Sequence, residues 1–124
     1  MRYALNIDGR EYDLPVKTIQ IQDKLDRIKK DIVGRDTKSA AQKKYEFVKE
    51  LIGEEKAEEI FDTDKIEEID LGMLEIAYRG IFMGYRAPEL EYQASENMKA
   101  LGEPVLDRLM QIAQSLETVS ELSK

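Results

Sequence analysis

The chain lacks cysteine, histidine and tryptophan, and proline accounts for only 3 of its 124 residues. Without cysteine it forms no disulfide, holds no metal through thiolates and has no cysteine nucleophile. Without histidine it lacks the side chain that most often serves as a general base and as a transition-metal ligand. An enzyme built on this chain would have to rely on carboxylates and lysine.

Long apolar runs are also missing. No stretch approaches the roughly 20 apolar residues that span a bilayer, and the chain reaches a turn at Asp8-Gly9 before a signal-peptide core could form. We therefore expect no membrane partner and a cytoplasmic location. The formal net charge of −7 repels phosphate backbones, so nucleic acid is not an expected partner.

Charge is unevenly spread along the chain. Residues 17–50 carry ten basic and six acidic side chains, a net of +4, whereas residues 51–70 carry nine acidic and two basic, a net of −7. Two solvated helix faces explain this pattern, and we prefer that interpretation to a nucleic-acid contact because acids are mixed into the basic segment. The asymmetry would also orient a partner or a second subunit.

Residues 1–15 are predicted to form a β-hairpin. Asp8-Gly9 suits a two-residue turn, because both residues tolerate positive φ. The turn pairs Ile7 with Arg10 and places five apolar side chains on one face: Tyr3, Leu5, Ile7, Tyr12 and Leu14. Two strands alone are marginally stable, so this face is expected to pack on helices.

Residues 16–124 are predicted to form a helical bundle, which makes the whole chain, 1–124, a compact, mainly α single domain. Its five to six helices are expected from the helical spacing of apolar residues, at about 18–33, 37–52, 54–61, 71–86, 89–101 and from Pro104 onward. Pro88 and Pro104 are expected to set off new helices, since a proline suits the first turn.

The helix at 71–86 is the most apolar. Its charged residues lie on one narrow stripe: Glu75, Arg79 and Arg86. A helix that is apolar on nearly all sides is expected to be central and buried. Gly80 and Gly84 are expected to let a neighbouring backbone approach closely. They do not form a phosphate-binding loop, because they lie inside a helix and no Gly-Lys-Ser/Thr follows them.

The candidate binding surface lies on the same helix. Methionine and aromatic side chains are frequent at adaptable protein interfaces, and so broad an apolar girdle is hard to cover fully in 124 residues. Methionine and aromatic side chains are equally common in a hydrophobic core, and the alternative that these residues are core residues stays open. The residues assigned to a partner-binding site are Met73, Ile76, Tyr78, Phe82, Met83 and Tyr85.

No catalytic residue, cofactor or metal site is predicted. The acidic segment 62–64 superficially suggests a calcium loop, but the EF-hand spacing requires oxygen ligands at positions 5 and 12 and a glycine at position 6. Counted from Asp62, these positions hold Ile66, Met73 and Glu67. The segment is therefore interpreted as a capped turn.

One stretch resembles a known protein family. Residues 45–61 (YEFVKELIGEEKAEEIF) read as a helix, a Gly-Glu-rich turn and a short helix, and residues 66–71 (IEEIDL) then open a long helix that ends in Gly84-Tyr85. This layout, over residues 37–86, is similar to that of the small tail assembly chaperone proteins of long-tailed phages and prophages. Those proteins are short, acidic, mostly helical and without enzyme motifs.

The resemblance implies a non-enzymatic protein that binds the tape measure protein and keeps it in solution while tail tube subunits assemble around it. In that family a longer form often arises by translational frameshift. An apolar groove with a charged rim would suit the role, because a bare tape measure is long, helical and aggregation-prone.

Two further hypotheses stay open. The first is a structural phage protein or self-assembling subunit, such as a head–tail connector or tail component, which would form a homo-oligomer. The second is an enzyme or nucleotide-binding regulator that uses Asp or Glu bases and a lysine. A stable ring formed without a partner would favour the first, and a thermal shift with nucleotides or divalent metals would favour the second.

Overall fold

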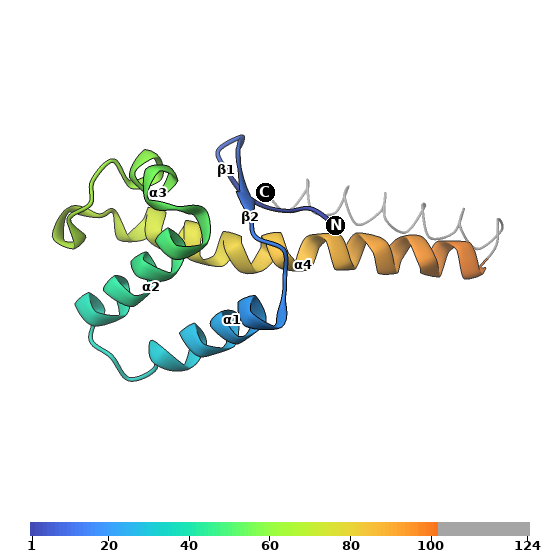
Figure 1. Ribbon diagram of the computed structural model, residues 1–124, viewed down its shortest axis with the longest axis horizontal. Coiled ribbons are helices and arrows are strands. Elements are labelled where there is room, and N and C mark those ends of the chain that lie inside the picture. The colour runs from blue at the N-terminus through green and yellow to red at the C-terminus, as the bar shows by residue number, and fades with distance from the viewer. Residues whose placement is uncertain (102–124) are drawn as a thin grey trace, which may run out of the picture. The chain divides into compact units, whose positions relative to one another are not determined.

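The computed structural model describes residues 1–101. These residues form an N-terminal antiparallel pair of strands followed by helices, so the mainly α fold with a β-hairpin is confirmed. The elements in chain order (Figure 1) are β1 Tyr3–Ile7, β2 Arg10–Leu14, α1 Ile19–Asp31, α2 Thr37–Ile52, α3 Glu54–Phe61, the 3₁₀ helix η1 Ile66–Glu68 and α4 Leu71–Leu101.

Contacts divide the chain into two units, Met1–Pro88 and Glu89–Lys124. The first unit contains the hairpin, α1, α2, α3, η1 and the first half of α4. The described part of the second unit, Glu89–Leu101, is the second half of α4. The expectation of one domain over residues 1–124 stays a prediction.

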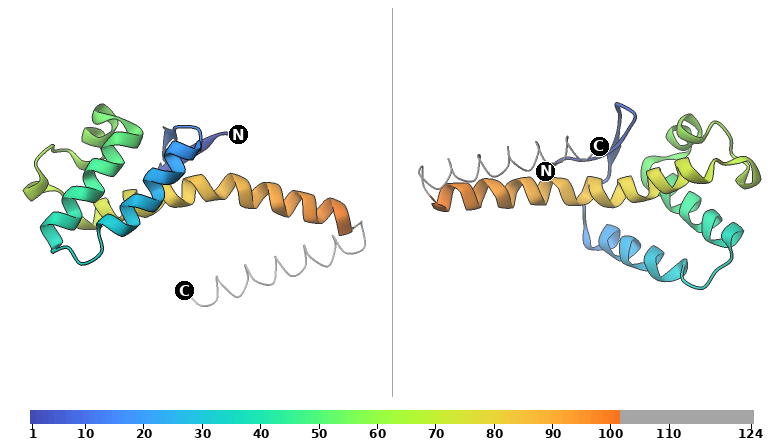
Figure 2. Two further views of the ribbon diagram at one scale, coloured as in Figure 1. Left: turned by 60° about the horizontal axis from the view of Figure 1, so that its bottom comes forward. Right: turned by 180° about the vertical axis from the view of Figure 1, so that it is seen from behind.

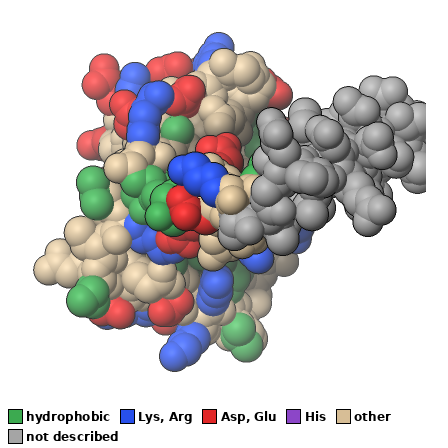
Figure 3. Space-filling model, turned by 90° about the vertical axis from the view of Figure 1, so that its right-hand side faces the viewer, with side chains coloured by type: hydrophobic (Ala, Val, Ile, Leu, Met, Phe, Trp, Pro, Cys, Tyr) green, Lys and Arg blue, Asp and Glu red, His purple; other side chains and the backbone are tan. Residues whose placement is uncertain are grey.

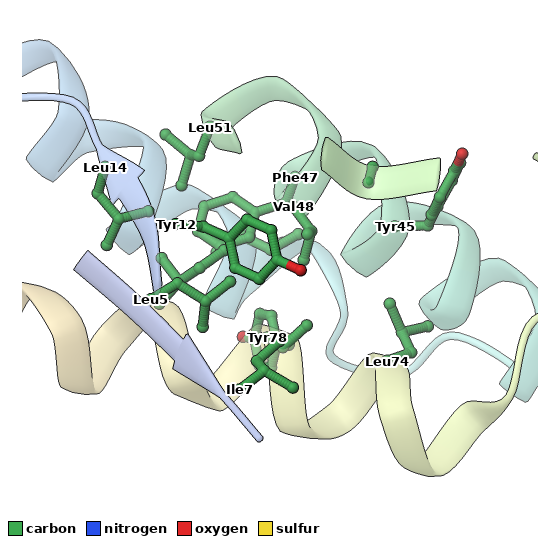
Figure 4. Close-up of a cluster of buried hydrophobic side chains, with 14 of the residues drawn as sticks. Leu5, Ile7, Tyr12, Leu14, Tyr45, Phe47, Val48, Leu51, Leu74 and Tyr78 are labelled. Atoms are coloured by element: carbon green, nitrogen blue, oxygen red, sulfur yellow. The ribbon is translucent and has the colours of Figure 1, made fainter. Parts of the chain in front are cut away.

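The hairpin has the predicted register. Ile7 lies opposite Arg10, and the pairing continues to the far ends of both strands. Asp8 and Gly9 have positive φ values of 49° and 79°, as this two-residue turn requires. The five apolar side chains of the predicted face are buried, and the close-up in Figure 4 shows hairpin side chains gathered with those of α2 and α4.

Side-chain caps begin three of the helices. Thr18 accepts a hydrogen bond from the N–H of Ile21 at 3.3 Å, and Asp36 accepts one from the N–H of Ser39 at 2.7 Å. Asp70 accepts one from the second residue of α4 at 2.8 Å. These bonds satisfy N–H groups that a helix leaves unpaired in its first turn.

Helix α4 corrects the prediction of separate helices at 71–86 and 89–101. It runs through Pro88 without a break. Proline removes one backbone hydrogen bond and crowds the carbonyl four residues earlier, but good helix formers on both sides continue the helix. The described residues therefore hold four α-helices and one 3₁₀ helix, so the predicted count of five to six is wrong for them. The helix expected from Pro104 lies outside the described residues.

The core of the first unit lies where the hairpin, α2 and the first half of α4 meet (Figures 2 and 4). Leu5, Val48 and Ile81 come from these three elements, and each is completely buried. Tyr45 and Phe61 join α2 to α3 edge to face, with ring centroids 5.7 Å apart. Helix α1 adds three buried apolar side chains to the core: Ile21, Leu25 and Ile28.

The hairpin packs directly on two glycines of α4. A Cβ placed on Gly80 would lie 2.5 Å from a methyl group of Leu5. A Cβ placed on Gly84 would overlap the carbonyl oxygen of Ala4 and lie 2.9 Å from its carbonyl carbon. The predicted close approach of a neighbouring backbone is therefore confirmed, and it places β1 on one flank of α4.

Tyr85 connects α4 with the segment that leads from the hairpin into α1. Its phenol O–H donates a hydrogen bond to the carbonyl of Pro15 at 2.9 Å, and its ring centroid lies 5.1 Å from that of Tyr3. The residue is 1% exposed. Burial, with a smaller contribution from Tyr3, raises the pKa of Tyr85 to about 12.

This raised pKa predicts a loss of stability at high pH. Below the unfolded tyrosine pKa of about 10, the Tyr85 phenol is neutral in both the folded and the unfolded chain. Its full contribution to the free energy of unfolding is then present. As the pH rises from there through the folded pKa of about 12, the unfolded chain ionises first and is favoured. Urea denaturation should therefore show a steeper decline over this range in the wild type than in Tyr85→Phe. Equal declines would contradict the prediction.

Candidate functional site

The structure divides the six predicted binding residues between the core and the surface. Tyr78 and Tyr85 are buried, whereas Ile76 and Met83 are 54% and 71% exposed. The remaining two, Met73 and Phe82, are half-buried against the core. Helix α4 is therefore buried along one face and exposed along the other, and the expectation that it is buried on nearly all sides is wrong.

Tyr78 and Phe82 belong to an aromatic cluster with Phe47 of α2. Their centroids are 5.1 Å apart, and each lies 5.8 Å from the Phe47 ring. Lys29 lies over the ring of Phe82 at 4.9 Å, and Lys44 lies over that of Tyr78 at 5.1 Å. Cations at these distances interact favourably with ring faces. The cluster thus joins α2 to α4 and is a structural element.

Phe47, which is 5% exposed, was not among the residues predicted for the site. Phe47 lies on α2, outside the helix at 71–86 to which the candidate site was assigned. Helix α2 contacts α1, α3, η1 and β2, so its buried surface is wider than a single stripe. The burial of Phe47 could have been predicted from its large aromatic side chain, one turn before Leu51. A large apolar side chain on an otherwise charged helix favours burial.

Ile76 and Met83 stand seven residues apart on the exposed side of α4, which places them on one line along the helix. Arg79 follows Ile76 by three residues, and Arg86 follows Met83 by three. We call these four residues the exposed α4 face. It consists of an apolar row and a parallel basic row.

Glu75 fixes one member of the basic row. Its carboxylate accepts hydrogen bonds from Lys44 Nζ at 2.7 Å and from Arg79 Nε at 2.8 Å. These two bonds hold the pKa of Glu75 below its usual value. The Arg79 side chain is still 76% exposed, so the rest of its guanidinium faces solvent. Within residues 1–101, no acidic side chain forms an ion pair with Arg86.

A cavity of about 250 Å³ lies among the hairpin, α3 and the start of α4. Met73 lines it from α4, together with residues from the hairpin and α3: Ile7, Asp8, Arg10, Tyr12, Glu59 and Ile60. Residues three apart on a helix are neighbours, so Met73 connects this cavity with Ile76. Three of the six predicted residues, Met73, Ile76 and Met83, are therefore accessible to a partner.

The charge asymmetry along the sequence is reduced in space. Two ion pairs join the basic segment 17–50 to the acidic segment 51–70: Lys38–Glu67 at 3.1 Å and Lys49–Glu54 at 3.7 Å. Figure 3 shows acidic and basic side chains interspersed on one side of the molecule. Both pairs are exposed and screened by solvent, so their main effect is to distribute the charge.

The acidic segment 62–64 forms a turn, as predicted. Asp62 ends α3 with a φ of 56°, and the hydroxyl of Thr63 accepts a hydrogen bond from the Lys65 N–H and donates one to Glu68, both at 3.1 Å. In the described part of the chain, no three acidic side chains gather as metal ligands would. Among residues 1–101 there is also no helix of the length and apolarity that a membrane span requires.

No protein-family model, curated protein or solved structure matches this chain. The site is therefore interpreted from its own residues. Its distinctive feature is a helix that contributes one side to the core and presents large apolar side chains beside two arginines on the other.

Proposed function

We propose that this chain is a non-enzymatic tail assembly chaperone of a long-tailed phage or prophage, which acts in the bacterial cytoplasm. Its partner is the tape measure protein, which it keeps in solution during tail assembly. The observation that supports the proposal is the exposed α4 face, where Ile76 and Met83 are 54% and 71% exposed. Clustered apolar side chains on a surface are typical of protein-binding sites.

The charge of the chain suits this role. The net charge of −7 gives the chain, and any complex in which it coats an apolar partner, a repulsive outer surface that opposes aggregation. In this proposal the apolar face binds the partner, and the negative charge of the surrounding surface keeps the complex dispersed.

The proposal predicts that co-expression with the long helical protein encoded just downstream of the gene gives a complex that co-purifies. The double variant Ile76→Gln/Met83→Gln should weaken this complex by about a hundredfold, because it removes the apolar contact without adding charge. Fractionation and solution mass of the purified proteins measure the outcome.

The matched control is Ile19→Gln/Val33→Gln, which removes two apolar side chains that are 83% and 76% exposed elsewhere on the first unit. This variant should retain the complex. All four positions are exposed, so each variant should fold with a change in stability near 0.5 kcal/mol or less per site. A wild-type chain that leaves the tape measure insoluble would contradict the proposed function.

A second candidate function is a structural phage protein or self-assembling subunit, such as a head–tail connector or tail component. The same exposed apolar face supports it, since subunit interfaces are also apolar. The solution mass of the purified protein separates the two functions. A large closed assembly that forms without any partner would favour the structural subunit.

A further inference from the structure

The apolar and basic rows of the exposed α4 face share one repeat of seven residues. At 1.5 Å per residue, successive side chains in each row are about 10 Å apart along the helix. A bound β-strand presents side chains on one face roughly every 7 Å, so its side chains would not stay in register with rows spaced by about 10 Å. A second helix with apolar residues at seven-residue intervals matches, and such helices pack side by side.

The two flanks of the apolar row differ. On a helix, residues at i+3 and i+4 lie on opposite sides of residue i, so Arg79 and Gly80 flank Ile76. The Gly80 flank is occupied by the hairpin, because a Cβ there would meet Leu5 at 2.5 Å. The arginine flank is open, with Arg79 76% exposed and Arg86 exposed. A helix lying on the apolar row would therefore have one edge against these two arginines.

We infer that the exposed α4 face binds an amphipathic helix of the partner protein, one with apolar residues at every seventh position and acidic residues along the edge that meets Arg79 and Arg86. The local charge is opposite to that of the chain as a whole, which is −7, so the face selects an acidic edge by complementarity. This inference rests on the proposed function, because it names the kind of partner segment that the same face binds.

A second copy of the chain fits this face less well. In an antiparallel two-fold pair, each flank of the face meets the same flank of its copy. Arg79 and Arg86 would then lie against their own counterparts, and like charges across helices repel. An acidic-edged helix from a different protein removes this repulsion and replaces it with attraction.

Two designed, fluorescently labelled helical peptides test the inference with the full-length chain. Both carry leucine at every seventh position, and they differ only in having glutamate or lysine along one edge. Fluorescence anisotropy at low salt should show that the glutamate peptide binds about tenfold more tightly, since it can form two ion pairs with Arg79 and Arg86 where the lysine peptide meets like charges. Salt should reduce this preference.

Two variants locate the binding. Arg79→Glu/Arg86→Glu should reverse the preference in favour of the lysine peptide. Ile76→Gln/Met83→Gln should abolish binding of both peptides, and Ile19→Gln/Val33→Gln should change neither. No binding of the glutamate peptide, or equal binding of both peptides by the wild type, would overturn the inference.

Two other occupants of the exposed α4 face are a second copy of the chain and the chain's own residues. Because the chain has no cysteine, single-cysteine variants test for both. Met83→Cys should react with iodoacetamide as fast as Val33→Cys in the free chain, and the glutamate peptide should protect Met83→Cys alone. If Met83→Cys is already protected, the solution mass identifies the occupant. A dimer would assign the face to a second copy and a monomer to the chain's own residues, and either result overturns the inference.

Failure of the inference is distinguishable from failure of the proposed function. If the tape measure protein co-purifies with Arg79→Glu/Arg86→Glu and Ile76→Gln/Met83→Gln as well as with the wild type, the chaperone function stands and the binding face is wrong. If the glutamate peptide binds as expected but the tape measure does not, the face stands and the proposed function falls.

Discussion

Replacing Gly84 with alanine is expected to lower the free energy of unfolding by about 3 kcal/mol or more. The new Cβ would overlap the backbone oxygen of Ala4 and lie 2.9 Å from both the Ala4 carbonyl carbon and a methyl group of Leu14. A backbone carbonyl in a paired strand has no rotamer through which to move away. The hairpin must therefore shift as a whole, which disturbs the core beneath it.

The same substitution at Gly80 is a matched comparison. Its Cβ would meet a methyl group of Leu5 at 2.5 Å, and a side-chain methyl can move by a change of rotamer even in a packed core. Alanine also favours a helix over glycine by up to about 1 kcal/mol, which offsets part of the clash at either position. We expect a loss of about 1 kcal/mol for Gly80→Ala.

Urea denaturation followed by circular dichroism measures both variants, since the chain has no tryptophan for fluorescence. The order of the two effects is the decisive result. If Gly84→Ala were as stable as the wild type, the hairpin would not rest on α4 as described. If Gly80→Ala were the more damaging, the side chain of Leu5 would be the rigid contact and the Ala4 backbone the adaptable one.

The hairpin was predictable from the sequence because its pattern is local. The Asp8-Gly9 turn fixes which residues face each other, and the alternation of apolar residues fixes which face is buried. The structure has this register and this face. The caps at Thr18 and Asp70 are also local features, since a cap depends on residues within one turn.

Pro88 shows where local rules fail. A proline favours a helix start, but it is also tolerated inside a helix when the surrounding residues favour helix strongly enough. The sequence around Pro88 contains a signal for a helix start and signals for a continuous helix, and local rules do not decide which of them prevails. The structure has one continuous helix from Leu71 to Leu101.

The sequence was enough to assign the candidate site to the helix at 71–86, but not to predict which of its side chains are exposed and which are buried. The apolar side chains at 71–86 are too many to cover easily in 124 residues, which pointed to six large side chains, but the same pattern also predicted a helix buried on nearly all sides. Which of them are exposed depends on where the hairpin and α2 pack around the helix. Tyr85 and Met83 are only two residues apart, yet one is 1% exposed and the other 71%. That difference is a tertiary property, because the hairpin and Pro15 cover one side of α4 and leave the other open.

Tyr85→Ala is the substitution in the core with the largest expected effect, a loss of about 4 kcal/mol in the free energy of unfolding. It removes a 1% exposed ring, its contact with Tyr3 at 5.1 Å and the hydrogen bond to Pro15. Loss of the ring leaves a cavity between α4 and the hairpin, because neighbouring side chains collapse into such a space incompletely.

Two companion variants assign the loss to its causes. Tyr85→Phe keeps the ring and removes the hydroxyl, so it should cost about 1 kcal/mol for the hydrogen bond to the Pro15 carbonyl. Tyr92→Ala removes the same side chain seven residues further along α4, where it is 61% exposed, and should change stability by about 0.5 kcal/mol or less. Equal losses for Tyr85→Ala and Tyr92→Ala would contradict the burial of Tyr85. A loss for Tyr85→Phe close to that for Tyr85→Ala would mean that the hydrogen bond to Pro15, and not the ring, joins α4 to the hairpin and α1.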